Sequence, residues 1–183
     1  IISTPPGLHA SQARFAMNHN LHVLMEKPMT IRAADAKALL QLAQNKKRIL
    51  HVGYQRHHQA AYVHVRKMIA TGQLGRLRSV IGYVTQNWFA AGLGWRVDPK
   101  LSGGGMFMDT GSHLVAAILF LTGLSIQEVT AFVDNVGVPV DLNTVVALCF
   151  VGGAVGTITT IGNAEKHDEQ ISIHGDKGSI TIH

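Results

Sequence analysis

Residues 21–54, LHVLMEKPMTIRAADAKALLQLAQNKKRILHVGY, place one amphipathic segment between two short apolar runs. The runs at 21–25 and 49–54 predict strands, because each is short, apolar and bounded by polar or turn-forming residues. The segment at 31–45 predicts a helix, and Thr30, directly before it, is suited to cap that helix. Strand–helix–strand order with short loops implies parallel strands joined by a right-handed crossover.

The residues before this stretch extend the pattern toward the N-terminus. A turn at 5–7 (PPG) and a helix at 8–19 follow residues 1–4, which look like the end of a further strand. Repeated units of this kind are typical of a doubly wound sheet that binds a nucleotide. We therefore expect residues 1–54 to be a partial Rossmann domain, the C-terminal half of its parallel sheet, whose earlier strands would precede Ile1.

The pattern changes after residue 54. Turns at 151–154 and 175–178 separate alternating strands, which is typical of antiparallel hairpins, and one long apolar helix interrupts the strands. Residues 55–183 are therefore expected to form a partial α+β domain with a large, mostly antiparallel sheet, whose last strand stops in mid-pattern. The predicted helices are 60–71 and 106–122, and the predicted strands are 77–87, 127–138, 143–151, 154–161, 170–174 and 179–183.

Composition limits the class of protein. The 183 residues are 46% hydrophobic and 15% charged, which predicts a folded chain with a substantial core. The lone Cys149 excludes an intrachain disulfide and is expected to be a small core side chain, which suits a reducing, cytoplasmic compartment. The longest apolar run, 114–121, has 8 residues, far fewer than the roughly 20 that span a bilayer, so no membrane association is expected.

The net charge of +5 is unevenly distributed along the chain. Residues 1–100 hold 14 of the 16 Lys and Arg side chains, whereas residues 101–183 hold 8 of the 11 Asp and Glu side chains. A basic first half suits a phosphate-bearing ligand, and it equally suits a solvated basic surface. Nucleic-acid binding is not expected, because the sequence lacks a basic stripe with interleaved aromatic residues.

Three polar residues stand on apolar elements. Lys27 follows a predicted strand, at the carboxyl end where α/β sheets bind ligands, and Asp109 and His113 lie four residues apart on the apolar helix. An amine, a carboxylate and an imidazole are the groups needed to move a proton on and off a hydroxyl group. The glycines at 103–105 indicate a close backbone approach before that helix. The same residues would equally suit a self-satisfied buried pair and a surface lysine.

The 11 histidines also raise the question of a metal site. His57 and His58 with His64, or Asp109 with His113, are the candidate ligand groups. Neither group has the usual tight ligand spacing, and no cysteine accompanies them. We therefore expect no metal site.

These residues belong to a series of motifs that resembles the Gfo/Idh/MocA family, named after glucose–fructose oxidoreductase and inositol dehydrogenase. The resemblance covers essentially the whole chain in the family's order. Seven segments carry it: 4–9 (TPPGLH), 22–28 (HVLMEKP), 52–56 (VGYQR), 72–75 (GQLG), 95–99 (WRVDP), 103–113 (GGGMFMDTGSH) and 175–179 (GDKGS).

The resemblance implies an enzyme that uses NAD or NADP to move hydride to or from a sugar, polyol or related carbonyl compound. It implies that Lys27 hydrogen-bonds the reacting oxygen, that His113 is the general acid/base, and that Asp109 orients His113 or a substrate hydroxyl. It also implies that the sheet of the second domain forms a homo-oligomer, a dimer or tetramer. The cofactor-binding residues that it implies are Thr4, Pro5, His9, Glu26, Lys27, Arg56, Trp95 and Arg96.

Two departures from the family pattern affect these expectations. The G-x-G-x-x-G loop and the acidic residue that follows it are absent, so NAD and NADP cannot be told apart. Ala116 stands where many members carry an acid, which puts one substrate-hydroxyl contact in doubt. Two other functions stay open: an NAD-dependent glycosidase without net redox change, and a non-catalytic nucleotide-binding regulator.

Overall fold

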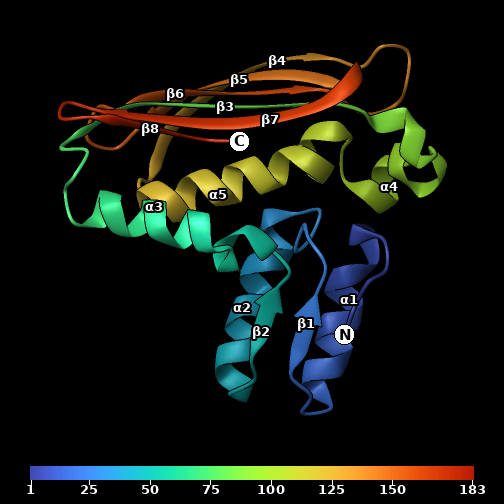
Figure 1. Ribbon diagram of the computed structural model, residues 1–183. Coiled ribbons are helices and arrows are strands. Elements are labelled where there is room, and N and C mark those ends of the chain that lie inside the picture. Colours follow the sequence, from blue (N-terminus) through green and yellow to red (C-terminus); the bar gives the residue numbers. More distant parts are fainter.

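The computed structural model describes residues 1–183, except for the side chain of Ala91. Figure 1 shows a small α/β part below, a wide sheet above, and helix α5 between them. The small part consists of α1 (Pro6–Asn18), β1 (Val23–Met25), α2 (Ala33–Lys46) and β2 (Leu50–Val52).

The small part has the expected parallel topology. Strands β1 and β2 pair in parallel, with Leu24 opposite His51, and Ile2 forms a further parallel bridge to Met25. Helices α1 and α2 flank these strands (Figure 1) and close a separate small core. The buried members of this core are Ile2, Ala13, Met17, Val23, Met25, Leu39 and Ala43.

Thr30 does not cap α2, contrary to the expectation. The helix begins at Ala33, and its N-cap position is Arg32, whose side chain makes no capping bond. The Thr30 hydroxyl instead donates to the Arg32 carbonyl at 2.8 Å. A hydroxyl that donates in this way stabilises the turn before the helix but cannot accept from the first helical N–H groups through that bond.

The large part is a six-stranded sheet with the order β4-β5-β6-β3-β7-β8. Its strands β3 and β6 pair in parallel and the other neighbours are antiparallel, so the predicted α+β class is confirmed. The strands are β3 (Leu77–Asn87), β4 (Ile126–Asp134), β5 (Asn143–Phe150), β6 (Val155–Ile161), β7 (Asn163–Gly175) and β8 (Ser179–Ile182). The helical elements are η1 (Gln55–His58), α3 (Ala60–Ala70), η2 (Trp88–Ala91), η3 (Gly94–Val97), α4 (Pro99–Ser102), η4 (Phe107–Gly111) and α5 (Ser112–Thr122).

Strand β7 is much longer than the predicted strand at 170–174. It begins at Asn163 and stays paired with β3 through a polar segment, with Thr85 opposite Asp168. Backbone pairing needs no apolar side chain, so hydrophobic patterning alone marks only the buried end of such a strand.

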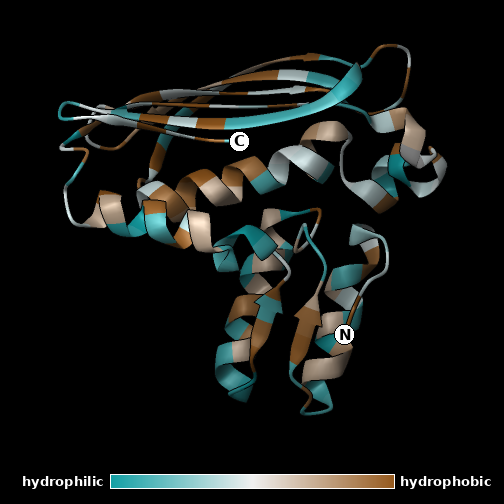
Figure 2. Cartoon of the chain, viewed as in Figure 1, coloured by the Kyte–Doolittle hydropathy of each residue, from teal (hydrophilic) through white to brown (hydrophobic). Residues whose placement is uncertain are grey.

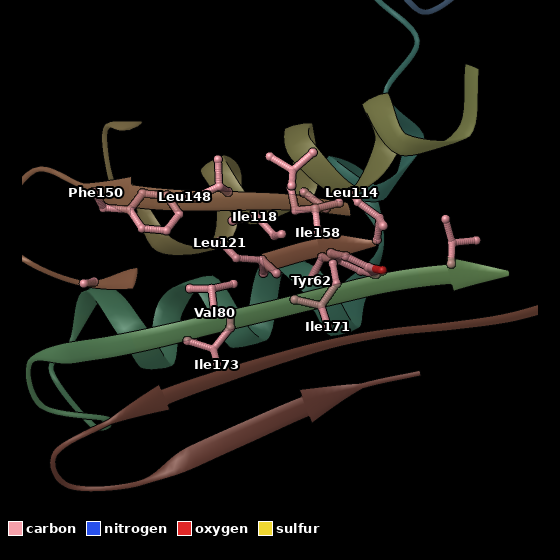
Figure 3. Packing of buried hydrophobic residues seen from close by; sticks show 14 of the residues in the cluster. Tyr62, Val80, Leu114, Ile118, Leu121, Leu148, Phe150, Ile158, Ile171 and Ile173 are labelled. Carbon is pink, nitrogen blue, oxygen red and sulfur yellow. The ribbon is translucent and has the colours of Figure 1, made fainter. Parts of the chain in front are cut away.

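Helix α5 carries the main core. Its residues Leu114, Ile118 and Leu121 are buried against the inner face of the sheet, where they meet Val80 and Ile158 (Figure 3). Figure 2 shows α5 as predominantly apolar and the exposed helices as mixed. A helix that is apolar nearly all round is buried on most sides. Because α5 lies between the sheet and the small part, the residues at its N-terminal end have a fixed position relative to both.

One segment, Pro99–Thr122, is long and apolar enough to be a candidate membrane span by length and composition. In the structure it is interrupted, because Gly103 adopts a left-handed backbone conformation between α4 and η4. Its α5 portion packs Leu114, Ile118 and Leu121 against the sheet. This α5 portion is therefore the core helix of the domain.

Cys149 is exposed on the outer face of the sheet, so the prediction of a core side chain is wrong. In β5 burial alternates, with Val146, Leu148 and Phe150 on the inner face. Side chains of a strand alternate between its two faces, which sends Val145 and Cys149 outward although the whole run is apolar.

Candidate active site

A cleft of about 450 Å³ lies where the small part meets α5. The ends of β1 and β2 form one wall, with Glu26, Lys27 and Gly53, and Tyr54 and His113 form another. The carboxyl ends of parallel strands converge on the same edge of a sheet, which is where α/β proteins bind ligands. The structure therefore brings the three sequence-predicted groups Lys27, Asp109 and His113 to one region, although 82 positions separate the first two.

Lys27 is bound to Asp109. Its Nζ donates to Asp109 Oδ1 at 2.6 Å and to the Asp109 carbonyl at 2.8 Å. The two side chains are 16% and 27% exposed, so the pair is shielded from bulk water on most sides. An ammonium has three N–H donors, and two of them are used here. The third is left for a group in the cleft.

The other carboxylate oxygen of Asp109 is also held. Trp88 Nε1 donates to Oδ2 at 3.0 Å, and Arg96 Nε lies 3.7 Å from the same oxygen. Burial acts to raise the pKa of Asp109, but the Lys27 ammonium, helped by Trp88 and Arg96, lowers it below the ordinary value. Asp109 is therefore a carboxylate that holds Lys27 in place. The structure thus joins Asp109 to Lys27 rather than to His113.

His113 is a neutral imidazole at neutral pH. Burial lowers its pKa to about 4, and the positive charges of Lys27 and Arg56 act in the same direction against the opposing charge of Asp109. Its ring meets the Tyr54 ring edge-on, with centroids 5.9 Å apart. Its Nδ1 is buried without a hydrogen-bond partner among the described residues. A neutral imidazole beside an ammonium can accept a proton that the ammonium cannot.

The helix that carries Asp109 is not regular at this point. Residues 107–111 form a π-helical turn, η4, where the sequence predicts a continuous helix over 106–122. The Asp109 carbonyl in this turn accepts from Lys27 Nζ at 2.8 Å and from the Ser112 hydroxyl at 3.0 Å. Such turns are common at functional sites, because they turn side chains and carbonyl groups away from the regular helix ladder.

Glu26, Thr4 and Pro5 lie at strand ends, as expected. Glu26 lines the cleft, and its carboxylate accepts from the Lys27 backbone N–H at 3.3 Å. Pro5 is the N-cap of α1, and the Thr4 hydroxyl donates to Gln12 Oε1 at 2.8 Å. These three residues are therefore available along the edge of the sheet on which a dinucleotide would lie.

His9 is buried, and both of its ring nitrogens are bound within the chain. It is 0% exposed, with Nδ1 3.0 Å from the Pro28 carbonyl and Nε2 2.8 Å from the Thr4 carbonyl. Its ring thus ties the loop after β1 to the loop before α1. His9 positions the residues around Thr4 and Lys27 and lies beneath them.

The three other predicted cofactor-binding residues lie in two different regions: Arg56 lies against the sheet, and Trp95 and Arg96 lie near Asp109. Arg56 pairs with Glu169 of β7, and its Nη1 is buried without a partner among the described residues, so it joins the small part to the sheet. Arg96 lies 4.8 Å above the Trp95 ring, beside Asp109. Arg96 thus reaches the site through Asp109, whereas the guanidinium of Arg56 points to the sheet.

Two residues near the site were not among the predicted site residues. Trp88 follows the strand at 77–87, and its indole is 2% exposed while its N–H binds Asp109. Tyr54 lines the cleft, and burial raises its pKa above the ordinary value while a hydrogen bond to Ser112 opposes that effect. A buried indole or phenol needs a partner for its polar atom, which is the signal that marks both residues.

Two of the histidines suggested as metal ligands make aromatic contacts. His57 stacks on Phe120 with ring centroids 4.4 Å apart, and His58 lies 5.6 Å from His51. Within the described part of the chain, no group of three or more His, Cys, Asp or Glu side chains is arranged to hold a metal ion.

The Rossmann-type segment thus brings Lys27, at the end of β1, to Asp109 and into the same cleft as His113. The family described as oxidoreductase family, NAD-binding Rossmann fold, matches residues 1–54, and the GFO/IDH/MocA C-terminal domain matches residues 62–181. The chain therefore belongs to the Gfo/Idh/MocA family, as its motifs indicated.

Individual relatives agree with this assignment. Levoglucosan dehydrogenase from Pseudarthrobacter phenanthrenivorans is 27% identical, over 99% of this chain and 54% of its own length. An oxidoreductase domain protein from Kribbella flavida superposes with a TM-score of 0.89 at 33% identity, over 98% of this chain and 52% of its own. An inositol dehydrogenase homolog from Azotobacter vinelandii, complexed with NAD+, superposes with a TM-score of 0.91 at 26% identity, over 98% and 50%. The chain thus spans about half the length of these relatives.

Proposed function

We propose that the full-length protein is an NAD- or NADP-dependent oxidoreductase that transfers hydride between the nicotinamide and a hydroxyl-bearing carbon of a sugar or polyol. The observation that carries this proposal is that the Lys27 amine and a neutral His113 line one cleft at the strand ends of an NAD-binding fold. The names of the relatives, levoglucosan dehydrogenase and inositol dehydrogenase homolog, support the substrate class.

The strand ends fit a nicotinamide. Gly53 leaves the end of β2 without a side chain, and the Glu26 carboxylate borders the same cleft. Thr4, Pro5 and Glu26 would hold the nicotinamide end of the cofactor. When bound, the cofactor supplies the acceptor or donor of the hydride.

In the direction of oxidation, the chain's own residues handle the proton. His113 accepts the hydroxyl proton, because its imidazole is neutral. The free N–H of Lys27 donates to the same oxygen and stabilises the negative charge that develops there. Asp109 keeps Lys27 directed at that point through its 2.6 Å contact. In the direction of reduction, the same groups return the proton to the carbonyl oxygen.

The test is an assay of the full-length protein with NAD+ or NADP+ and a panel of sugars, anhydrosugars and polyols. Appearance of the reduced cofactor in step with substrate loss is the expected result. Cleavage of a glycoside without net cofactor reduction would instead favour the NAD-dependent glycosidase. Tight cofactor binding without turnover of any substrate in the panel would favour the non-catalytic regulator.

We also propose that the protein forms a homo-oligomer through the outer face of its sheet. Four apolar side chains on adjacent strands β3 to β6 are exposed there: Ile81 at 44%, Phe132 at 76%, Val145 at 43% and Val155 at 52%. A contiguous apolar surface of this kind is seldom left in contact with water. A second copy of the same sheet is the occupant that we expect.

Phe132→Asp is expected to shift the mass in solution toward that of the monomer. Association would bury a carboxylate in an apolar surface, so we expect self-association to weaken by about 10- to 100-fold. Light scattering after size exclusion checks this. Leu40→Asp is the matched control, because Leu40 is 52% exposed on α2, away from the sheet. An unchanged mass for Phe132→Asp would place the interface elsewhere.

A further inference from the structure

The three glycines at 103–105 have a specific partner. The sequence indicates that something approaches the backbone closely here, and in the structure that group is Asp141. A Cβ built on Gly105 would lie 1.8 Å from the Asp141 carbonyl oxygen, and a Cβ on Gly104 would lie 3.3 Å from its Oδ1. The position of Asp141 therefore requires glycine at residue 105.

Asp141 accepts from three consecutive backbone N–H groups. Its Oδ1 accepts from Gly105 at 2.6 Å, its carbonyl oxygen from Met106 at 2.9 Å, and its Oδ2 from Phe107 at 2.6 Å. The first N–H groups of a helix have no partners within the helix. A carboxylate at this end also interacts favourably with the positive end of the helix dipole. Asp141 thus binds the whole start of the helical segment that carries Asp109.

Asp141 is itself held in place by the sheet. Its neighbours Val140 and Leu142 are 4% and 0% exposed. The Leu142 N–H donates to the Asp134 carbonyl at 3.1 Å, and the Leu142 carbonyl accepts from the Gly162 N–H at 3.0 Å. Asp141 is therefore fixed to the ends of β4, β5 and β6, and its contacts transmit this position to the helix.

The helix start determines where the proposed catalytic groups lie. Phe107, whose N–H binds Asp141, is the first residue of the π-helical turn, and Asp109 follows two residues later. We propose that Asp141 is a positioning residue, which holds this turn so that Asp109 reaches Lys27. The inference rests on the proposed function, in which the Lys27–Asp109 pair acts on the reacting oxygen.

Asp141→Asn in the full-length protein tests the inference. The amide keeps the size of the side chain. In the wild-type protein the two carboxylate oxygens accept from the Gly105 and Phe107 N–H groups, and in the variant one of these N–H groups faces an NH2 group, which cannot accept. We expect kcat/KM to fall by about 10- to 100-fold, because a small displacement of a catalytic group has effects of that size. We also expect acetylation of Lys27 by acetic anhydride, followed by peptide mass spectrometry, to become several-fold faster once Asp109 has moved.

The matched control is Asp134→Asn. Asp134 lies at the other end of the same loop, and its side chain accepts only from the exposed Val136 N–H at 3.0 Å. We expect neither kcat/KM nor the acetylation rate of Lys27 to change in this variant. Gly104→Ala is a second, milder probe of the same contact, to be used if Asp141→Asn does not fold.

Each outcome decides the question. A lower melting temperature with unchanged Lys27 acetylation and unchanged kcat/KM per folded molecule would mean that Asp141 only stabilises the fold, which would overturn the inference. If the wild-type protein transfers no hydride, the proposed function fails. The acetylation rates still decide whether Asp141 holds Asp109 on Lys27.

Discussion

Lys27→Met in the full-length protein is expected to lower kcat by about 10³-fold or more and to leave the fold intact. The methionine fills the space of the lysine stem but cannot donate to the reacting oxygen. Loss of one such donor alone costs about 10²- to 10³-fold. The loss here is larger, because Asp109 then remains as a carboxylate without the ammonium that it binds at 2.6 Å. Steady-state kinetics with saturating cofactor measure the effect.

The controls separate charge from geometry. Lys27→Arg keeps the positive charge but changes the donor geometry, so we expect an intermediate loss of kcat. The circular dichroism spectrum is expected to stay near wild type in both variants, because Lys27 contributes to neither core. Near-normal turnover of Lys27→Met would remove Lys27 from the mechanism.

Local patterns in the sequence predicted the elements and the position of Lys27. The spacing of apolar residues in 21–54 was sufficient for the parallel strands, because the two strands pair within one short crossover unit. The end of a strand is a local property, so the location of Lys27 at the sheet edge followed from the same pattern. Asp109 and His113 were recognisable because polar groups are costly on a helix that is otherwise apolar.

Contacts between distant residues could not be predicted in this way. The glycines at 103–105 indicated a close approach, but the identity of Asp141 as the partner depends on a pairing across 36 positions. The partner of Asp109 was expected to be His113, four residues away, or a substrate hydroxyl, whereas the structure supplies Lys27 and Trp88. The π-helical turn could not be predicted from the local sequence, because it depends on contacts that its residues make with distant parts of the chain.

The alternation of β5 gave a different kind of error. A continuous apolar run is compatible with a strand buried on both faces or with one whose outer face is also apolar. Cys149 was placed in the core under the first interpretation, and its exposure supports the second. Which apolar residues of β5 lie on the outer face can therefore be assigned only when the layers of the fold are known.

The pH dependence of kcat/KM is expected to report the neutral state of His113. Because burial and the charges of Lys27 and Arg56 lower its pKa from 6.5 to about 4, the imidazole remains unprotonated at all pH values above that point. Oxidation of the substrate should therefore lose rate only as the pH falls through about 4, and not near 6.5. His113→Asn removes the base and is expected to lower kcat/KM by about 10²- to 10⁴-fold and to abolish this acidic limb.

The cause of the shift can be tested through its charges. Lys27→Met removes one cation that lowers the pKa of His113, so the acidic limb of the residual activity should move upward, toward the ordinary value of 6.5. Arg66→Met is the control, because its guanidinium lies over Phe120 and is not among the charges that act on His113. An acidic limb near 6.5 in the wild-type protein would mean that the base titrates as an ordinary exposed histidine. The buried imidazole between two cations would then not be the group that accepts the proton.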